Sequence, residues 1–158
     1  MNDHRRYSRM NAQELHLAIR RLEELARGEA PGWAVAFDEG VRTIIEKAGS
    51  SAIPRLLFLL NDESNNHEVM FSVVHGVESF DDDLYIAKLV ACTPLLLDKS
   101  PYWLSVLYMR VLNSDRSRAA LRSAVGPDTR STIASILGLI VAKRPSFCDQ
   151  IDWVLFED

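Results

Sequence analysis

The sequence predicts an all-α fold for this chain of 158 residues. Apolar residues recur at a spacing of three or four, as at Leu15, Ile19, Leu22 and Leu25, which is typical of one face of a helix. Short polar joints separate the apolar stretches, and no stretch with the alternation of a strand is bounded by hairpin turns. We therefore expect about nine short antiparallel helices, arranged as a HEAT-like α-solenoid or as an irregular helical bundle. A solenoid should repeat at a fixed period, and no such period is visible.

The first two helices carry start and stop signals. Asn11 followed by Glu14 has the pattern of a capping box, so the first helix should begin there and end at Gly28. Pro31 can open the second helix in its first turn, and Gly49 should close that helix.

The next two helices enclose a polar loop. A short, very apolar helix should cover residues 53–60, with Ser50 or Ser51 as its N-cap. Residues 61–66 are polar and form the loop, and the apolar stripe of residues 69–80 predicts the next helix.

The middle of the chain should hold the most buried helix. The acidic residues 81–83 can cap a helix that starts near Leu84, and we expect this helix to bend or break at residues 93–94, a Thr-Pro pair. Ser100 with Pro101 should open the following helix, which is apolar almost all round and so belongs in the centre of the structure.

The C-terminal part predicts three more helices. One should cover residues 115–124, one should run from the Gly-Pro pair at 126–127 to about residue 143, and the last should open at Pro145. We expect residues 1–158 to form a single helical domain in which residues 1–10 are a flexible N-terminus.

The composition, with 47% hydrophobic and 25% charged residues, is that of an ordinary globular protein. It excludes a disordered chain, a collagen-like repeat and a basic nucleic-acid coat protein. Two cysteines, Cys92 and Cys148, cannot make a disulfide framework and fit a reducing compartment. Neither an export signal nor a membrane-spanning run is visible, so we expect a cytoplasmic protein with no membrane partner.

Charge is distributed unevenly, although 18 Lys and Arg nearly balance 22 Asp and Glu. Residues 56–87 contain no Lys or Arg, whereas residues 110–144 are the basic counterpart. The acids of residues 56–87 are Asp62, Glu63, Glu68, Glu78, Asp81, Asp82 and Asp83, and a second acidic group comprises Asp149, Asp152, Glu157 and Asp158. Because a concentrated negative surface attracts basic proteins and repels nucleic acid, we expect a protein partner and no direct contact with nucleic acid.

No catalytic or metal-binding constellation is visible. His67-Glu68 begins like a zinc-peptidase motif, but Phe71 stands where the second histidine belongs. Cys92 lies in an apolar run and should be an inert core thiol, while the acids near Cys148 should raise the pKa of its thiol. We expect no enzymatic activity, no cofactor and no metal.

One ion pair is expected inside the structure. Arg110 interrupts an apolar helix, and a buried guanidinium needs a carboxylate partner. Glu78 shares a helix flank with His75 and is the best-placed carboxylate, so we expect a buried Glu78–Arg110 pair that His75 and Asn113 complete.

Aromatic residues divide between core and surface. Trp103 should pack in the core, as large aromatic side chains usually do. Tyr85 follows the acidic residues 81–83 and Tyr102 follows the Ser-Pro turn, so both could anchor an interface beside the acids.

The central motifs give the chain a family resemblance. The sequence H-G-V-E-S-F at residues 75–80, S-P-x-W at residues 100–103 and R-x-L-N at residues 110–113 resemble the immunity protein 30 family of bacterial polymorphic-toxin systems, over residues 54–125. The resemblance implies a small cytoplasmic antitoxin that binds and blocks the toxin domain of a secreted or contact-delivered effector. Toxins of such systems are often nucleases, whose phosphate-binding sites are basic.

These observations predict an immunity protein that neutralises a cognate toxin domain, a basic nuclease, by binding it. The alternative is an α-solenoid adaptor for a basic host peptide or subunit. The expected contact residues are Asp62, Glu63, Asp81, Asp82, Asp83, Tyr85 and Tyr102, with the second acidic group as the other candidate surface.

Overall fold

The computed structural model describes residues 9–156, and all of the regular elements in this range are helical. The α-helices are α1 (Ala12–Leu25), α2 (Trp33–Ala48), α3 (Ile53–Leu57), α4 (His67–Glu78), α5 (Asp82–Lys99), α6 (Pro101–Leu112), α7 (Asp115–Ala124), α8 (Pro127–Lys143) and α9 (Cys148–Leu155). Two 3-10 turns, Gly49–Ala52 and Pro145–Phe147, precede α3 and α9. The predicted all-α class is confirmed.

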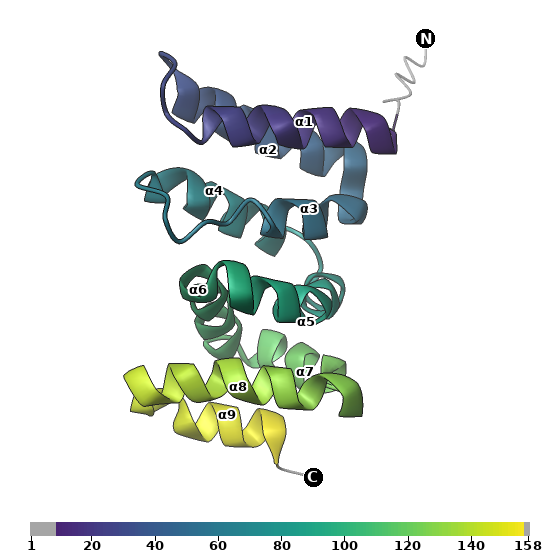
Figure 1. The fold of residues 1–158 in the computed structure, drawn as a ribbon. Helices are drawn as coiled ribbons and strands as arrows, with labels where there is room; N and C mark the ends of the chain where they lie inside the picture. The colour runs from purple at the N-terminus through teal and green to yellow at the C-terminus, as the bar shows by residue number, and fades with distance from the viewer. Residues whose placement is uncertain (1–8, 157–158) are drawn as a thin grey trace.

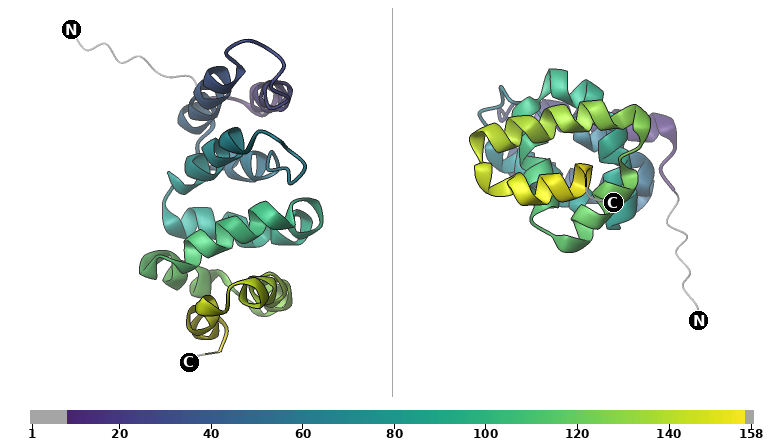
Figure 2. Two further views of the ribbon diagram at one scale, coloured as in Figure 1. Left: turned by 90° about the vertical axis from the view of Figure 1, so that its left-hand side faces the viewer. Right: turned by 90° about the horizontal axis from the view of Figure 1, so that it is seen from below.

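The helices follow one another along a single axis in the order of the sequence (Figure 1). In one layer α3 contacts α5, α5 contacts α7 and α7 contacts α9. In the other layer α2 contacts α4 and α6 contacts α8. The left view of Figure 2 shows helical pairs stacked from the N-terminal to the C-terminal end, an order that is compatible with an α-solenoid. Its assignment to the HEAT type stays a prediction.

Local signals set most helix ends as expected. The Asn11 side chain accepts a hydrogen bond from the Glu14 backbone N–H at 2.9 Å, and the Glu14 carboxylate accepts one from the Asn11 N–H at 2.8 Å. Gly28 and Gly49 follow α1 and α2 with φ of 72° and 60°, a region that side chains with a Cβ avoid. Residues 1–8 of the expected flexible N-terminus lie outside the described residues, whereas the Met10 N–H donates to the Lys47 carbonyl at 3.0 Å.

Some predicted helix starts and ends are wrong. Pro31 does not open α2, because Gly32 adopts a left-handed conformation and the helix begins after it. Neither serine caps α3, since the Ser51 hydroxyl donates backward to the Ala48 carbonyl at 2.8 Å. The helix that was predicted to reach Leu60 ends at Leu57. The apolar residues Leu59 and Leu60 lie outside the helix but are still buried.

The predicted break at Thr93-Pro94 does not occur, because α5 continues through both residues. The buried Thr93 hydroxyl donates to the Leu89 carbonyl at 2.8 Å, one turn earlier in α5. It also lies 2.6 Å from the Tyr108 hydroxyl of α6, with which it shares a hydrogen bond. This buried pair joins α5 to α6.

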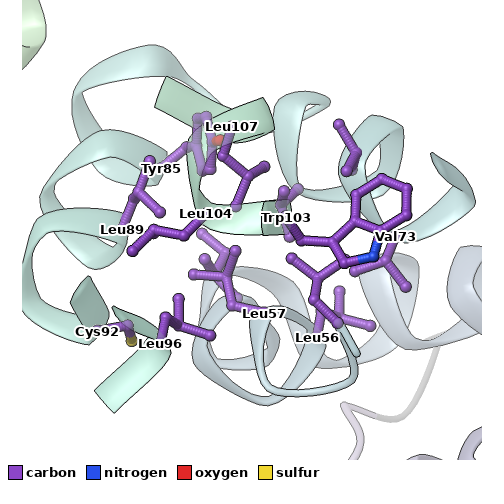
Figure 3. Packing of buried hydrophobic residues seen from close by; sticks show 14 of the residues in the cluster. Leu56, Leu57, Val73, Tyr85, Leu89, Cys92, Leu96, Trp103, Leu104 and Leu107 are labelled. Atoms are coloured by element: carbon purple, nitrogen blue, oxygen red, sulfur yellow. The ribbon is translucent and has the colours of Figure 1, made fainter. Parts of the chain in front are cut away.

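The two largest fully buried side chains of the core, Trp103 and Tyr108, both come from α6. Trp103 is fully buried, and Figure 3 shows its indole beside Val73 of α4 and close to Leu56 of α3. Leu104 and Leu107 extend the same cluster toward α5 (Figure 3). The buried apolar cluster has members from α1 to α9. No helix within residues 9–156 combines the length and the apolar character that crossing a membrane requires.

Removing the Tyr108 hydroxyl tests the polar contact between α5 and α6. We expect Tyr108→Phe to lower the free energy of unfolding by about 1 kcal/mol, since it leaves Thr93 with one hydrogen bond fewer. Urea denaturation followed by circular dichroism measures the change. The exposed Tyr102 is the matched control, and Tyr102→Phe should shift the value by less than about 0.5 kcal/mol.

Candidate functional site

The loop at residues 61–66 is bound to the first turn of α6. The Asp62 carboxylate accepts hydrogen bonds from the backbone N–H groups of Tyr102 at 2.8 Å and Trp103 at 3.2 Å. Ser100, which was expected to cap this helix, is buried and donates its hydroxyl to the Leu60 carbonyl at 2.7 Å. Asp62 is thus the N-cap of α6 in effect, although 40 residues separate it from Tyr102.

This junction brings together aromatic rings from the first turns of α4 and α6. The His67 ring centroid lies 5.5 Å from that of Trp103 and 6.1 Å from that of Tyr102. Phe71, one turn farther along α4, meets Trp103 edge-to-face at 5.1 Å. Trp103 is buried beneath the cluster, but Phe71 is 37% exposed and Tyr102 is 52% exposed. We call the surface formed by His67, Phe71, His75 and Tyr102 the α4–α6 face.

The other end of this face holds the predicted ion pair. Arg110 donates from Nε to Glu78 Oε1 at 2.5 Å and from Nη2 to Oε2 at 2.7 Å, which confirms the pairing. The expected burial is wrong, because the side chains remain 41% and 25% exposed at the ends of α6 and α4. Glu78 reinforces the charged state of Arg110 by hydrogen bonding and raises its pKa.

His75 and Asn113 do not complete this ion pair. Within the described residues neither side chain makes a hydrogen bond to Glu78 or Arg110. The His75 ring instead lies 6.2 Å from that of Phe71, and Asn113 lines a pocket beside the pair.

The acidic residues 81–83 are partly neutralised by a base from α7. Arg116 Nη2 lies 3.0 Å from Asp81 Oδ2, and its Nε lies 3.6 Å from Asp82 Oδ2. Asp82 also accepts a hydrogen bond from the Ser117 hydroxyl at 3.1 Å, and Asp81 caps α5 by accepting from the Asp83 N–H. The stretch 56–87 has no Lys or Arg of its own, but in the folded protein Arg116 of α7 lies beside two of its acids.

Tyr85 does not belong to the exposed surface. Only 3% of it is exposed, so the prediction that it anchors an interface is wrong. It lies one turn before Leu89 on the buried side of α5 (Figure 3). Burial raises the pKa of its phenol, which stays neutral. Its hydroxyl is buried and makes no hydrogen bond to any residue in the range 9–156.

Three carboxylates of the stretch 56–87 make no hydrogen bond or ion pair within the described residues. They are those of Glu63, Glu68 and Asp83, and all three residues are exposed. Glu63 and Glu68 flank the start of α4, whereas Asp83 follows its end. Since α4 has 12 residues, about 18 Å of helix separates the two acidic ends of the face.

The second acidic group is only partly described. Asp149 and Asp152 lie exposed on α9, and Glu157 and Asp158 lie outside the described residues. The Asp152 carboxylate raises the pKa of the exposed Cys148 thiol, as predicted. Cys92 is buried, and burial raises the pKa of its thiol.

Sequence reasoning missed the contribution of His67 and Phe71 to this surface. A signal was available, because residues 67, 71 and 75 are spaced by four and share one side of α4. What the sequence did not show is that Tyr102 and Trp103 meet this side. Among residues 9–156, no group of three or more His, Cys, Asp or Glu side chains is arranged to hold a metal ion.

Because the Glu78–Arg110 pair is partly exposed to water, breaking it should lower stability only slightly. We expect Arg110→Ala to lower the free energy of unfolding by about 1 kcal/mol or less, because water solvates the Glu78 carboxylate that is left behind. Urea denaturation gives the value. A loss above about 3 kcal/mol would mean that the carboxylate is desolvated, as in a buried pair.

Two adjacent acids should differ in their contribution to stability. Asp62→Ala removes the acceptor for the first turn of α6, and we expect a loss of about 1–2 kcal/mol. Glu63→Ala removes an exposed side chain and should change stability by less than about 0.5 kcal/mol. Thermal and urea unfolding of both variants measure the difference, and equal losses would contradict the capping role.

Comparison with known protein families assigns the chain to a family. The family model described as Immunity protein 30 matches residues 15–121, which run from α1 into α7 and include the whole α4–α6 face. No curated protein and no solved structure matches the chain. Since the family match spans more than half of the sequence, the protein belongs to the Immunity protein 30 family and is an immunity protein against a toxin.

Proposed function

We propose that the protein neutralises its toxin by binding it directly through the α4–α6 face and the acids at the two ends of this face. The observation that carries the proposal is the exposed aromatic cluster around Tyr102, which lies beside carboxylates that have no basic partner among residues 9–156. Exposed aromatic rings supply contact area with little loss of side-chain freedom, and they are enriched at interfaces.

The charges of this surface favour a basic partner. Glu63 and Glu68 lie near the aromatic end, and Asp83 lies near the other end. Unpaired carboxylates attract a basic toxin from a distance and accelerate the encounter, whereas the rings provide the close contact. A nuclease, whose catalytic surface is basic because it binds phosphates, is the toxin class that suits this surface best. The family resemblance supports delivery of the toxin by contact-dependent inhibition or a similar secretion system as part of this proposal.

The predicted contact residues take different parts in this proposal. Tyr102, Glu63 and Asp83 are exposed and can touch the toxin directly. Asp62 contributes through the loop that it fixes, and Asp81 and Asp82 can reach a basic partner in exchange for Arg116. Tyr85 is not part of this surface.

In this proposal the protein acts by occupying the toxin and performs no reaction of its own. It would do so in the cytoplasm, where the toxin arrives. Family membership favours a toxin over a basic host peptide as the partner.

A charge reversal at the aromatic end tests the proposed surface. We expect Glu63→Lys/Glu68→Lys to slow association with the toxin domain encoded in the neighbouring reading frame about tenfold at low salt. The dependence of the association rate on ionic strength should flatten as well. Stopped-flow or surface plasmon resonance measurements at several salt concentrations give both quantities.

The matched control reverses two exposed acids of α2. Glu39→Lys/Glu46→Lys changes the net charge equally but lies away from the aromatic cluster. It should alter the association rate much less. If the two double variants behave alike, only the net charge of the protein matters and the proposed surface is wrong.

A further inference from the structure

A largely apolar pocket, here called the α6–α8 pocket, lies between α6 and α8 and adjoins the α4–α6 face. Its volume is ≈ 330 Å³, and its lining combines the start of α6 with the end of α8. Tyr102, Ser105 and Met109 are spaced by three and four residues, so they share one side of α6. Leu139 belongs to the wall that α8 provides. Because the Tyr102 ring also packs against His67, the pocket continues the surface proposed for the toxin.

The polar groups of this lining are already engaged within the chain. The Ser105 hydroxyl donates to the Pro101 carbonyl at 2.8 Å. Each oxygen of the Asp62 carboxylate accepts from one backbone N–H of α6. In contrast, Leu139 is 48% exposed and Tyr102 is 52% exposed, although both line the pocket. Because removing apolar surface from water is favourable, the pocket suits an apolar side chain of a partner.

Two exposed bases also belong to the lining. Lys143 is the last residue of α8, and Arg144 follows it. Within residues 9–156 neither side chain makes a hydrogen bond or an ion pair. The carboxylate of the lining, that of Asp62, is held by α6. The net charge of the pocket is therefore positive, opposite to that of the unpaired acids beside α4, and it favours an anionic group.

We propose that the α6–α8 pocket receives an apolar side chain of the toxin, and that a neighbouring Asp or Glu of the toxin pairs with Lys143 and Arg144. The N–H groups of both bases donate to this carboxylate. The inference rests on the proposed function, because the occupant belongs to the bound toxin. It requires the toxin to present bases toward the start of α4 and a carboxylate toward the end of α8, and this order fixes its orientation.

A charge reversal at the two bases tests the expected carboxylate. The double substitution Lys143→Glu/Arg144→Glu makes the protein more acidic, which by itself would strengthen attraction to a basic toxin. We expect the opposite result. The dissociation constant for the toxin domain should increase about tenfold or more, because the toxin carboxylate then meets two acids. Isothermal titration calorimetry measures this constant, and circular dichroism checks that the variant is folded.

The matched control reverses two exposed bases of α2. Arg42→Glu/Lys47→Glu changes the net charge equally, and neither side chain makes a hydrogen bond or an ion pair within the described part of the chain. Its dissociation constant should stay the same or fall, as net charge alone predicts. A double-mutant cycle then identifies the toxin carboxylate, because one Asp→Asn or Glu→Gln change in the toxin should weaken binding to the wild type but not to the Lys143/Arg144 variant.

The substitution Leu139→Ala tests the apolar part of the pocket. We expect the dissociation constant to increase about tenfold, because the toxin side chain loses apolar contact area. Leu17→Ala is the matched control, since it makes the same change at a leucine of α1 that is 61% exposed. It should leave the dissociation constant unchanged. Urea denaturation checks that both variants are folded.

The outcomes separate this inference from the proposed function. If the wild type binds the toxin domain and either the Lys143/Arg144 variant or Leu139→Ala binds it equally well, the inference fails while the proposed function stands. If the wild type does not bind the toxin domain, both fail. If the wild type forms dimers that Leu139→Ala dissociates in analytical ultracentrifugation, the occupant is a second copy of the chain and the inference is wrong.

Discussion

The contact between the Asp62 carboxylate and the first turn of α6 is the constraint on which the candidate surface depends. Two backbone N–H groups of α6 need acceptors, and a loop residue 40 positions earlier provides both. The buried Trp103 strengthens the junction, since its indole N–H donates to the Asn61 carbonyl at 3.2 Å. Because α4 begins directly after this loop, the position of its aromatic side chains relative to α6 follows from the same contact.

Local patterns in the sequence were sufficient for much of the fold. Periodic apolar residues and the Asn11 capping box predicted helices correctly, because these signals act within one helix. Pairing of Arg110 with Glu78 was also predictable, since a guanidinium in an apolar helix needs an acid. The partial exposure of the pair was not predictable, because it depends on where both helices end.

The parts that the sequence did not predict involve partners on other helices. Arg116 lies beyond residues 56–87, so a count of charges along the chain could not show that it neutralises Asp81 and Asp82. The cap that Asp62 provides is equally remote in sequence. The burial of Tyr85, in contrast, could have been predicted. Its spacing from Leu89 and Leu96 places all three residues on the same side of a helix, and that side of α5 is buried.

The acids of this surface divide into those that hold the fold together and those that remain available to a partner. Asp62 belongs to the first group and Glu63 to the second, although they are neighbours in the sequence. Charge alone therefore does not identify an interface. A carboxylate that already accepts hydrogen bonds from backbone N–H groups has fewer acceptor positions left for a partner. The aromatic rings are the more direct indication of contact, since nothing in the described fold requires Tyr102 to be exposed.

Arg116 has a consequence for how this surface can diversify. Its guanidinium occupies two carboxylates from the exposed side of α7 and contributes nothing to the apolar core. A single codon change at this position would release two negative charges without disturbing the packing beneath them. The charge of the surface near the start of α5 thus depends on one side chain, and it can change while the scaffold stays the same.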